Sequence, residues 1–259
     1  MSPRTPLRHS RPQALIEIQL EVLGRPIWQC VQAGPGPIRL VEVLPLARRL
    51  CDRIASQLGR HPSSLDQPSP CRLSCCTCCR YLVPLTELES LDLLEQVEAL
   101  PQPRRRQVLE AFDHAAGRIA QAGLPAGTEP AQLDVLWRWY RDLNLPCPLL
   151  ADRQCLLYSH RPLACREHLV GPAADCARLA HSQDGPLEMP LSVAAAVMEL
   201  TRELTASPGQ AVLLPLALDL ARRIGPRFER TFPAARVFAA FARILRSLAD
   251  ASAPHVEAW

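Results

Sequence analysis

Five cysteines stand within nine residues of this chain, in the string C-R-L-S-C-C-T-C-C from Cys71 to Cys79. A single free cysteine often fills a hydrophobic core, but core packing gives no reason to crowd thiols into a loop flanked by serine and proline. The pair Cys75-x-x-Cys78 has a chelating spacing, because a tight turn places both sulfurs on one side. Cys71 can add a third sulfur from the same loop. The string predicts a metal site, with regulated disulfide chemistry as the alternative.

A second group of cysteines follows at wider intervals, at Cys147, Cys155, Cys165 and Cys176. These gaps are too long for a single turn, so folding must bring each thiol to a common site. Cys147 is followed by proline, which suits iron–sulfur ligands because proline fixes the direction in which the chain leaves. The other cysteines include Cys30 and Cys51, which we expect to fill the core of a strand and a helix.

Composition places the protein in a reducing compartment. The chain has 259 residues and eleven cysteines, and its first residues lack the apolar core of a signal peptide or membrane span. Clustered cysteines in a cytoplasmic protein are metal ligands or catalysts more often than disulfides. The formal net charge is only +3 and every basic side chain is arginine, which argues against a nucleic-acid partner. We therefore expect a cytoplasmic bacterial protein, with no nucleic-acid or membrane partner.

The N-terminal part predicts a small antiparallel β element. Ile16, Ile18, Leu20 and Val22 alternate with polar residues, which is typical of a half-buried strand. Two further short strands are expected at 27–31 and 38–43, with Trp28 in the core.

The rest of the chain predicts helices. Helical periodicity indicates a helix over 46–58, and the capping box that begins at Thr86 starts another that reaches about residue 100. Further helices are expected at 104–122, 130–145, 191–206, 210–224 and 232–249, with 147–176 as loop and short turns. In the helix over 104–122 the inward positions are Val108, Phe112, Ala115 and Ile119. The predicted fold is mainly α, with a small N-terminal antiparallel β element and irregular, metal-organised cysteine loops. It divides into a β-hairpin element (12–45), a metal-binding domain (46–182) and a C-terminal helical segment packed on it (190–250).

The two cysteine groups together resemble the YkgJ-type cysteine-cluster family of zinc- or iron-chelating proteins. The likeness rests on C-R-L-S-C-C-T-C-C-R, on C-P-L-L-A-D-R-Q-C-L-L-Y-S-H-R-P-L-A-C-R-E-H-L-V and on a last cysteine. It covers about residues 71–176. The resemblance implies metal binding by eight cysteines, which in this chain are Cys71, Cys75, Cys78, Cys79, Cys147, Cys155, Cys165 and Cys176.

Two positions depart from the family pattern. Cys76 stands where relatives usually have glycine, so its thiol is either a bystander or an added ligand. Leu149 stands where phenylalanine is common, which changes only packing.

The nature of the metal and of any reaction stays open at this point. An iron–sulfur cluster is favoured over zinc, because the adjacent pair Cys78-Cys79 suits a polynuclear site better than one tetrahedral ion. Neighbouring side chains of an extended backbone point to opposite faces, so these two thiols should bind different metal atoms. The metal would organise the fold or serve electron transfer with a redox or protein partner. One alternative is a structural zinc module for protein–protein contact.

Enzymatic alternatives rest on weaker features. The spacing Cys71-x3-Cys75-x2-Cys78 also occurs in radical S-adenosylmethionine enzymes, but Thr77 stands where those usually carry an aromatic residue. Flagellin lysine N-methylases contain a similar cysteine module, which suggests an S-adenosylmethionine-dependent protein methyltransferase. The chain shows no glycine-rich loop typical of such enzymes, and no catalytic residue is assigned.

Several residues near the second cysteine group are candidates for supporting roles. Arg161 and Arg166 can donate hydrogen bonds to cluster sulfurs, or can be solvated surface groups. His160 and His168 are ligands, outer partners of the ligands, or surface groups. The remaining candidates are Asp152 and Glu167 as outer partners, and Trp137, Trp139 and Tyr140 as core residues that shield the site. The two cysteine groups must converge, with Cys75 close to Cys165.

Overall fold

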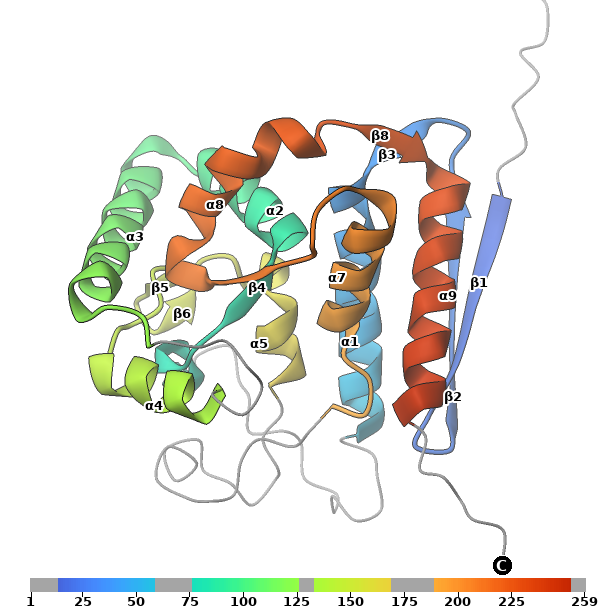
Figure 1. Ribbon diagram of the computed structural model, residues 1–259, viewed down its shortest axis with the longest axis horizontal. Coiled ribbons are helices and arrows are strands. Elements are labelled where there is room, and N and C mark those ends of the chain that lie inside the picture. Colours follow the sequence, from blue (N-terminus) through green and yellow to red (C-terminus); the bar gives the residue numbers. More distant parts are fainter. Residues whose placement is uncertain (1–13, 59–75, 126–132, 169–188, 253–259) are drawn as a thin grey trace, which may run out of the picture.

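The computed structural model describes residues 14–58, 76–125, 133–168 and 189–252 (Figure 1). Within these residues it contains eight α-helices and four small antiparallel strand pairs. This confirms the prediction of a mainly helical protein with a small N-terminal β element. Of the eight predicted ligands, Cys71, Cys75 and Cys176 lie outside the described residues.

The N-terminal hairpin joins β1 (Ala14–Val22) to β2 (Arg25–Ala33). Leu23 and Gly24 both have positive φ, at 53° and 70°, as a two-residue hairpin turn requires. One face buries aliphatic side chains such as Ile18 and Ile27. Because Ile27 points inward, its neighbour Trp28 points outward and is 54% exposed, so the prediction that Trp28 is a core residue is wrong.

The third expected strand, over 38–43, is only partly correct. The short strand β3 (Pro37–Arg39) pairs with β8 (Thr231–Pro233) near the end of the chain, and not with the hairpin. It leads into a 3-10 turn, η1 (Leu40–Val43), in which Leu40, Val41 and Val43 are all buried. Burial of consecutive residues belongs to a helical turn rather than to a strand with one polar face.

Three helices pack beside the hairpin at one side of the molecule: α1 (Leu44–Leu58), α7 (Val193–Leu204) and α9 (Ala234–Ser252) (Figure 1). Leu46, Leu50 and Ile54 of α1 are fully buried, as their helical spacing predicts. The side chain of Leu58 lies outside what the structure describes. The core of this half is continuous from the hairpin through these helices.

The opposite half contains α2 (Glu87–Glu98), α3 (Gln102–Ala122) and α4 (Leu133–Leu143). Thr86 caps α2 as predicted: its hydroxyl accepts from the Glu89 N–H, and the Glu89 carboxylate accepts from the Thr86 N–H. All four inward positions predicted for α3 are buried, and Gly123 ends this helix with φ of 67°.

The helix expected over 210–224 begins later than predicted. Its first residues form β7 (Ala211–Leu213), which pairs with β4 (Pro84–Thr86), and the 3-10 turn η6 (Leu214–Leu216) follows. Pro215 cannot supply a backbone N–H to an α-helix interior, so α8 (Ala217–Ile224) starts after it. The 3-10 turn η7 (Gly225–Phe228) then leads to β8.

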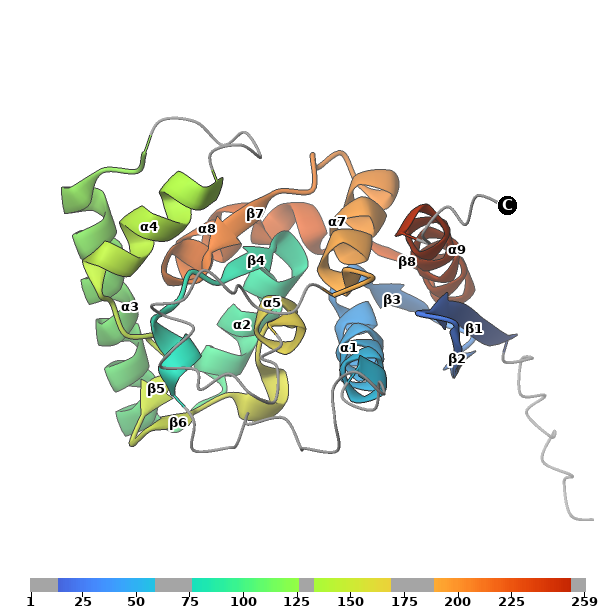
Figure 2. The same ribbon diagram turned by 90° about the horizontal axis from the view of Figure 1, so that it is seen from below.

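The short helix α5 (Leu163–Glu167) lies between the two halves, where α1 and α7 face α2 and β4 (Figure 2). The sequence predicted only loop and turns over this segment. The domain boundaries at 45, 182 and 190 stay a prediction. None of the described helices is long and apolar enough to cross a membrane.

Candidate metal centre

The described part of the first cysteine group forms a 3-10 turn, η3 (Thr77–Arg80), which carries Cys78 and Cys79. Cys76 precedes the turn with φ of −120°, a conformation open to any residue, so the backbone here does not require the glycine of the family pattern. Successive residues of a 3-10 helix differ in direction by about 120°. The thiols of Cys78 and Cys79 therefore diverge, although the backbone is not extended as the sequence argument assumed.

A backbone hydrogen bond joins the two cysteine groups. The N–H of Cys147 donates to the carbonyl oxygen of Cys79 over 2.7 Å. The expected convergence is confirmed for these described residues, while the expected proximity of Cys75 to Cys165 involves a residue outside them.

A small hairpin positions the first two thiols of the second group. The strands β5 (Leu150–Ala151) and β6 (Gln154–Cys155) pair, and the N–H of Leu150 donates to the Cys147 carbonyl over 2.9 Å. The N–H of the residue two positions after each thiol donates to its sulfur, from Leu149 to Cys147 and from Leu157 to Cys155. Such bonds stabilise a thiolate more than a thiol.

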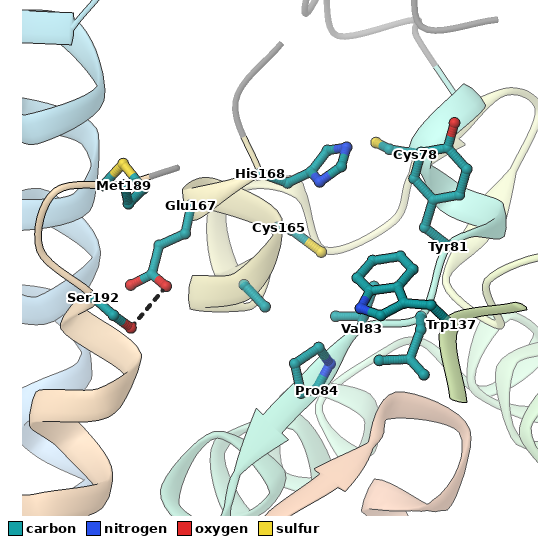
Figure 3. Close-up of a pocket in the computed structure, with 12 residues that line it drawn as sticks. Cys78, Tyr81, Val83, Pro84, Trp137, Cys165, Glu167, His168, Met189 and Ser192 are labelled. Atoms are coloured by element: carbon teal, nitrogen blue, oxygen red, sulfur yellow. Dashed lines mark hydrogen bonds between the residues drawn. The ribbon is translucent and has the colours of Figure 1, made fainter. Parts of the chain in front are cut away.

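The third thiol, Cys165, stands on α5 and faces Cys78 across a cavity of about 390 Å³. Figure 3 shows the two sulfur atoms directed into the space between α5 and the η3–β4 segment. Tyr81, Val83 and Trp137 contribute to an apolar wall of this cavity. The sites of Cys78 and Cys165 are therefore adjacent although 86 positions separate them in the sequence.

Four thiols gather in this way, since each pair among Cys78, Cys147, Cys155 and Cys165 is close enough for one negative charge to act on the other. Burial, followed by these like charges, raises the pKa of Cys165 well above its usual value. Burial is also the main cause that raises the pKa of Cys147 to about 12. A thiophilic cation reverses this balance, because it replaces the protons and neutralises the neighbouring thiolates.

The thiols are neighbours without being at ligand spacing. No group of three or more His, Cys, Asp or Glu side chains within the described residues is arranged to hold a metal ion. Zinc–sulfur bonds are about 2.3 Å long, so binding would draw the sulfurs inward. The cavity beside Cys78 and Cys165 leaves room for that movement.

Arg161 places a positive charge near these thiols. Its guanidinium favours the thiolate forms of Cys155 and Cys165, which opposes the burial that raises the pKa of both. It also lies 4.6 Å from the centre of the Tyr158 ring. Its Nε atom is buried and has no hydrogen-bond partner among the described atoms. A hydrogen-bond donor without a described partner, beside clustered thiols, fits an anionic metal–thiolate centre. Thiolates are also soft ligands, which suits zinc and iron–sulfur centres.

Buried charges fix the helix that carries Cys165. The Glu89 carboxylate caps α5 by accepting from the Leu163 N–H over 2.6 Å, in addition to its role in capping α2. Burial raises the pKa of Glu89, while these hydrogen bonds and Arg48 oppose the shift. One carboxylate thus ties α5 to the start of α2.

Arg166 makes a second connection, from α5 to α1. Its guanidinium donates to both carboxylate oxygens of Asp52, at 2.7 and 2.6 Å, and to the carbonyls of Ser159 and Arg161. The side chain is only 7% exposed. The hypothesis that Arg166 is a solvated surface group is therefore wrong, because the side chain holds the backbone that leads into Cys165. Its hydrogen bonds to described residues go to carboxylate and carbonyl oxygens, so a bond to a cluster sulfur stays a prediction.

Glu167 makes the third connection, to α7. Its carboxylate accepts from the Ser192 hydroxyl and the Ala194 N–H at the start of that helix (Figure 3). The Cys51 thiol donates to it over 3.8 Å from α1. Cys51 is fully buried, as predicted, whereas Cys30 is exposed on β2 and does not fill the core.

The other predicted supporting residues divide between site and surface. His168 lines the cavity and packs edge-on against Tyr81, with ring centres 5.5 Å apart, and burial lowers its pKa. His160 instead lies beside Arg48 and Asp92. Asp152 is exposed in the β5–β6 turn with φ of 49°, so its role is conformational.

The aromatic residues of α4 are only partly core. Tyr140 is buried as predicted and Trp139 is half-buried. Trp137 is 38% exposed because it borders the cavity rather than the core. The sequence did not reveal Asp52 and Glu89 as supports of α5. For Glu89 the one available signal was the capping box, which explains its bond to Thr86 but not its bond to α5.

Comparison with known families agrees with this arrangement. Residues 70–182 match the CxxCxxCC family model, described as "Putative zinc- or iron-chelating domain". The match spans both cysteine groups and confirms the resemblance drawn from their motifs. No curated protein and no solved structure is significantly similar to the chain.

Proposed function

We propose that this protein is a cytoplasmic metal-binding protein that holds an iron–sulfur cluster through its eight clustered cysteines. The observation that carries the proposal is the gathering of Cys78, Cys147, Cys155 and Cys165 from separate parts of the chain. The zinc- or iron-chelating description of the family supports a metal at this place. The remaining members of the set are Cys71, Cys75, Cys79 and Cys176.

The preference for iron–sulfur over zinc rests on the adjacent pair Cys78 and Cys79. Their thiols diverge on η3, so one tetrahedral ion cannot readily use both. More than one metal atom per chain follows if both are ligands. A redox role with a protein partner suits such a centre, and a structural zinc module is the alternative for the same thiols.

Anaerobic purification tests the proposal directly. Iron with acid-labile sulfide and a visible charge-transfer spectrum would support the cluster, and zinc alone would support the structural alternative. Folded protein that binds neither metal after reconstitution would refute metal binding.

Serine variants test the division of the cysteines. Cys147→Ser and Cys165→Ser should lower metal content and thermal stability together, because binding free energy is part of folding free energy. Cys30→Ser and Cys51→Ser should leave metal content unchanged. A metal loss in Cys51→Ser as large as that in Cys147→Ser would show that the division is wrong.

A further inference from the structure

We infer that the cavity between α5 and the η3–β4 segment binds a small organic cation, with an alkylated ammonium group held against the rings of Tyr81, Trp137 and His168. The inference goes beyond the proposed function, because this ligand is held by aromatic rings and needs no bond to a thiol. It gives a use to the apolar part of the cavity, which a metal bound to Cys78 and Cys165 does not require.

The size and wall of the cavity suit a small molecule. Its volume of about 390 Å³ falls within the range of roughly 300–1,000 Å³ that is typical of small-molecule sites. A water molecule takes up only about 30 Å³, so there is space for more than an ion at the thiols. Leu82, Val83, Pro84 and Met189 make much of the wall apolar. Trp137 is 38% exposed, so the cavity is open to solvent at this ring.

Three aromatic rings meet at steep angles around this cavity. The Tyr81 ring lies edge-on to Trp137, with ring centres 6.3 Å apart and planes inclined by 66°. It lies edge-on to His168 as well, at 5.5 Å and 63°. Figure 3 shows the rings around the space between α5 and the η3–β4 segment, with His168 extending from the α5 side. Rings that line one cavity at such angles present electron-rich faces to a shared space, which is how proteins bind quaternary ammonium groups.

The charges of the wall favour a cation over an anion. Among the described residues, Glu167 supplies the one carboxylate of this wall and no arginine belongs to it. The Glu167 carboxylate accepts from the Ser192 hydroxyl and the Ala194 N–H, so it contributes negative potential rather than a direct contact with a ligand. The Arg161 guanidinium lies near Cys165 without lining the cavity. An anionic ligand would therefore meet a carboxylate and two thiols, and no guanidinium.

Titration of the full-length, metal-loaded protein with three compounds of similar shape tests the inference. Choline, 3,3-dimethylbutan-1-ol and 3,3-dimethylbutanoate share a head of three methyl groups and differ in charge. We expect choline to bind about tenfold more tightly than the alcohol, because only the cation is attracted by the ring faces. Ring currents should shift its N-methyl proton resonances upfield. The carboxylate should bind no more tightly than the alcohol. Equal affinities for choline and the alcohol, or no binding of choline, would overturn the inference.

A matched pair of variants locates the binding. Trp137→Leu removes a ring from the wall and should weaken choline binding about tenfold, whereas Trp137→Phe keeps a ring and should weaken it less. Trp28→Leu makes the same change at an exposed position of β2 and should leave choline binding unchanged. Metal content and thermal unfolding of each variant are measured beside the titration. Wild-type affinity for choline in folded Trp137→Leu would exclude the cavity as the site.

The outcomes separate this inference from the proposed function. Metal-loaded protein that does not bind choline would overturn the inference alone. Folded protein that binds neither metal after reconstitution, but binds choline in a manner that depends on Trp137, would overturn the proposed function alone. Choline binding that is present in metal-free protein and lost on metal loading would show that the metal centre fills the cavity, and would overturn the inference.

Discussion

In the hairpin β1–β2 and its partner helix α9, the buried side chains are aliphatic or aromatic, including Ile18, Leu20 and Phe241. The segment from Cys147 to His168 is stabilised differently, by backbone bonds to sulfur, a buried arginine and two carboxylates that cap helices. Its thiols gather where burial and like charges oppose ionisation. The first region needs no ligand to be complete, whereas the second has the ionic character of a site that a cation completes.

The comparison also separates two kinds of burial. Aliphatic burial in the hairpin yields stability in proportion to the area removed from water. Burial of Glu89 and Arg166 yields little net stability. Each group instead holds α5 in place through specific hydrogen bonds, Glu89 to the Leu163 N–H and Arg166 to the Ser159 carbonyl. We interpret the second region as built to position Cys165.

Metal removal should give the largest effect and should be confined to the second region. A structural thiolate site contributes on the order of 10 kcal/mol to folding, so chelation should strongly increase amide hydrogen exchange in β5, β6 and α5. The amides of β1, β2 and α9 should keep their protection. Equal loss of protection in both regions would abolish the distinction between them.

Ile18→Ala should destabilise the hydrophobic region alone. The side chain is fully buried on β1, so we expect the free energy of unfolding to fall by about 3 kcal/mol in chemical denaturation. Metal content should not change. Leu15→Ala, at an exposed position of the same strand, is the control and should have little effect. Loss of metal from Ile18→Ala would indicate that the two regions are coupled.

Arg166→Ala should weaken metal binding as well as lower stability. The variant loses the bonds to Asp52, Ser159 and Arg161, for about 2 kcal/mol of stability, and frees the backbone before Cys165. Metal affinity, measured by chelator competition, should fall by about 10–100-fold, and the metal's visible spectrum should change.

Two further variants control this experiment. Arg222→Ala breaks an exposed pair with Asp219 and should change stability by less than about 0.5 kcal/mol, with unchanged metal affinity. Arg166→Lys keeps the charge but has one nitrogen in place of three. It cannot bond to Asp52, Ser159 and Arg161 together, so it should restore only part of the affinity. Unchanged affinity in Arg166→Ala would remove its positioning role.

Trp28→Thr should give the smallest effect. The indole is exposed on β2 and threonine also favours strands, so the free energy of unfolding should change by less than about 0.5 kcal/mol. A loss above about 2 kcal/mol in thermal or chemical unfolding would mean that this face of the hairpin is covered in solution.

The periodic elements could be predicted from the sequence because their cause is local. Alternation gave β1, and helical spacing gave α1 and the inward residues of α3, including Phe112 and Ile119. The capping box at Thr86 correctly placed the start of α2. Short-range patterns failed where the secondary structure depends on a partner strand far away in the sequence. This is the case for β3, which pairs with β8, and for β7, which pairs with β4.

The sequence by itself predicted a metal site, because core packing gives no reason to crowd five thiols into nine residues of a loop. The family resemblance added the expectation that the two cysteine groups meet. Only the tertiary structure decided how they meet. The direction of a side chain on η3, and the approach of Asp52 and Glu89 to α5, depend on contacts between residues far apart in the chain. The sequence does not show which backbone N–H a carboxylate will cap, because the packing of whole helices determines which N–H lies near it.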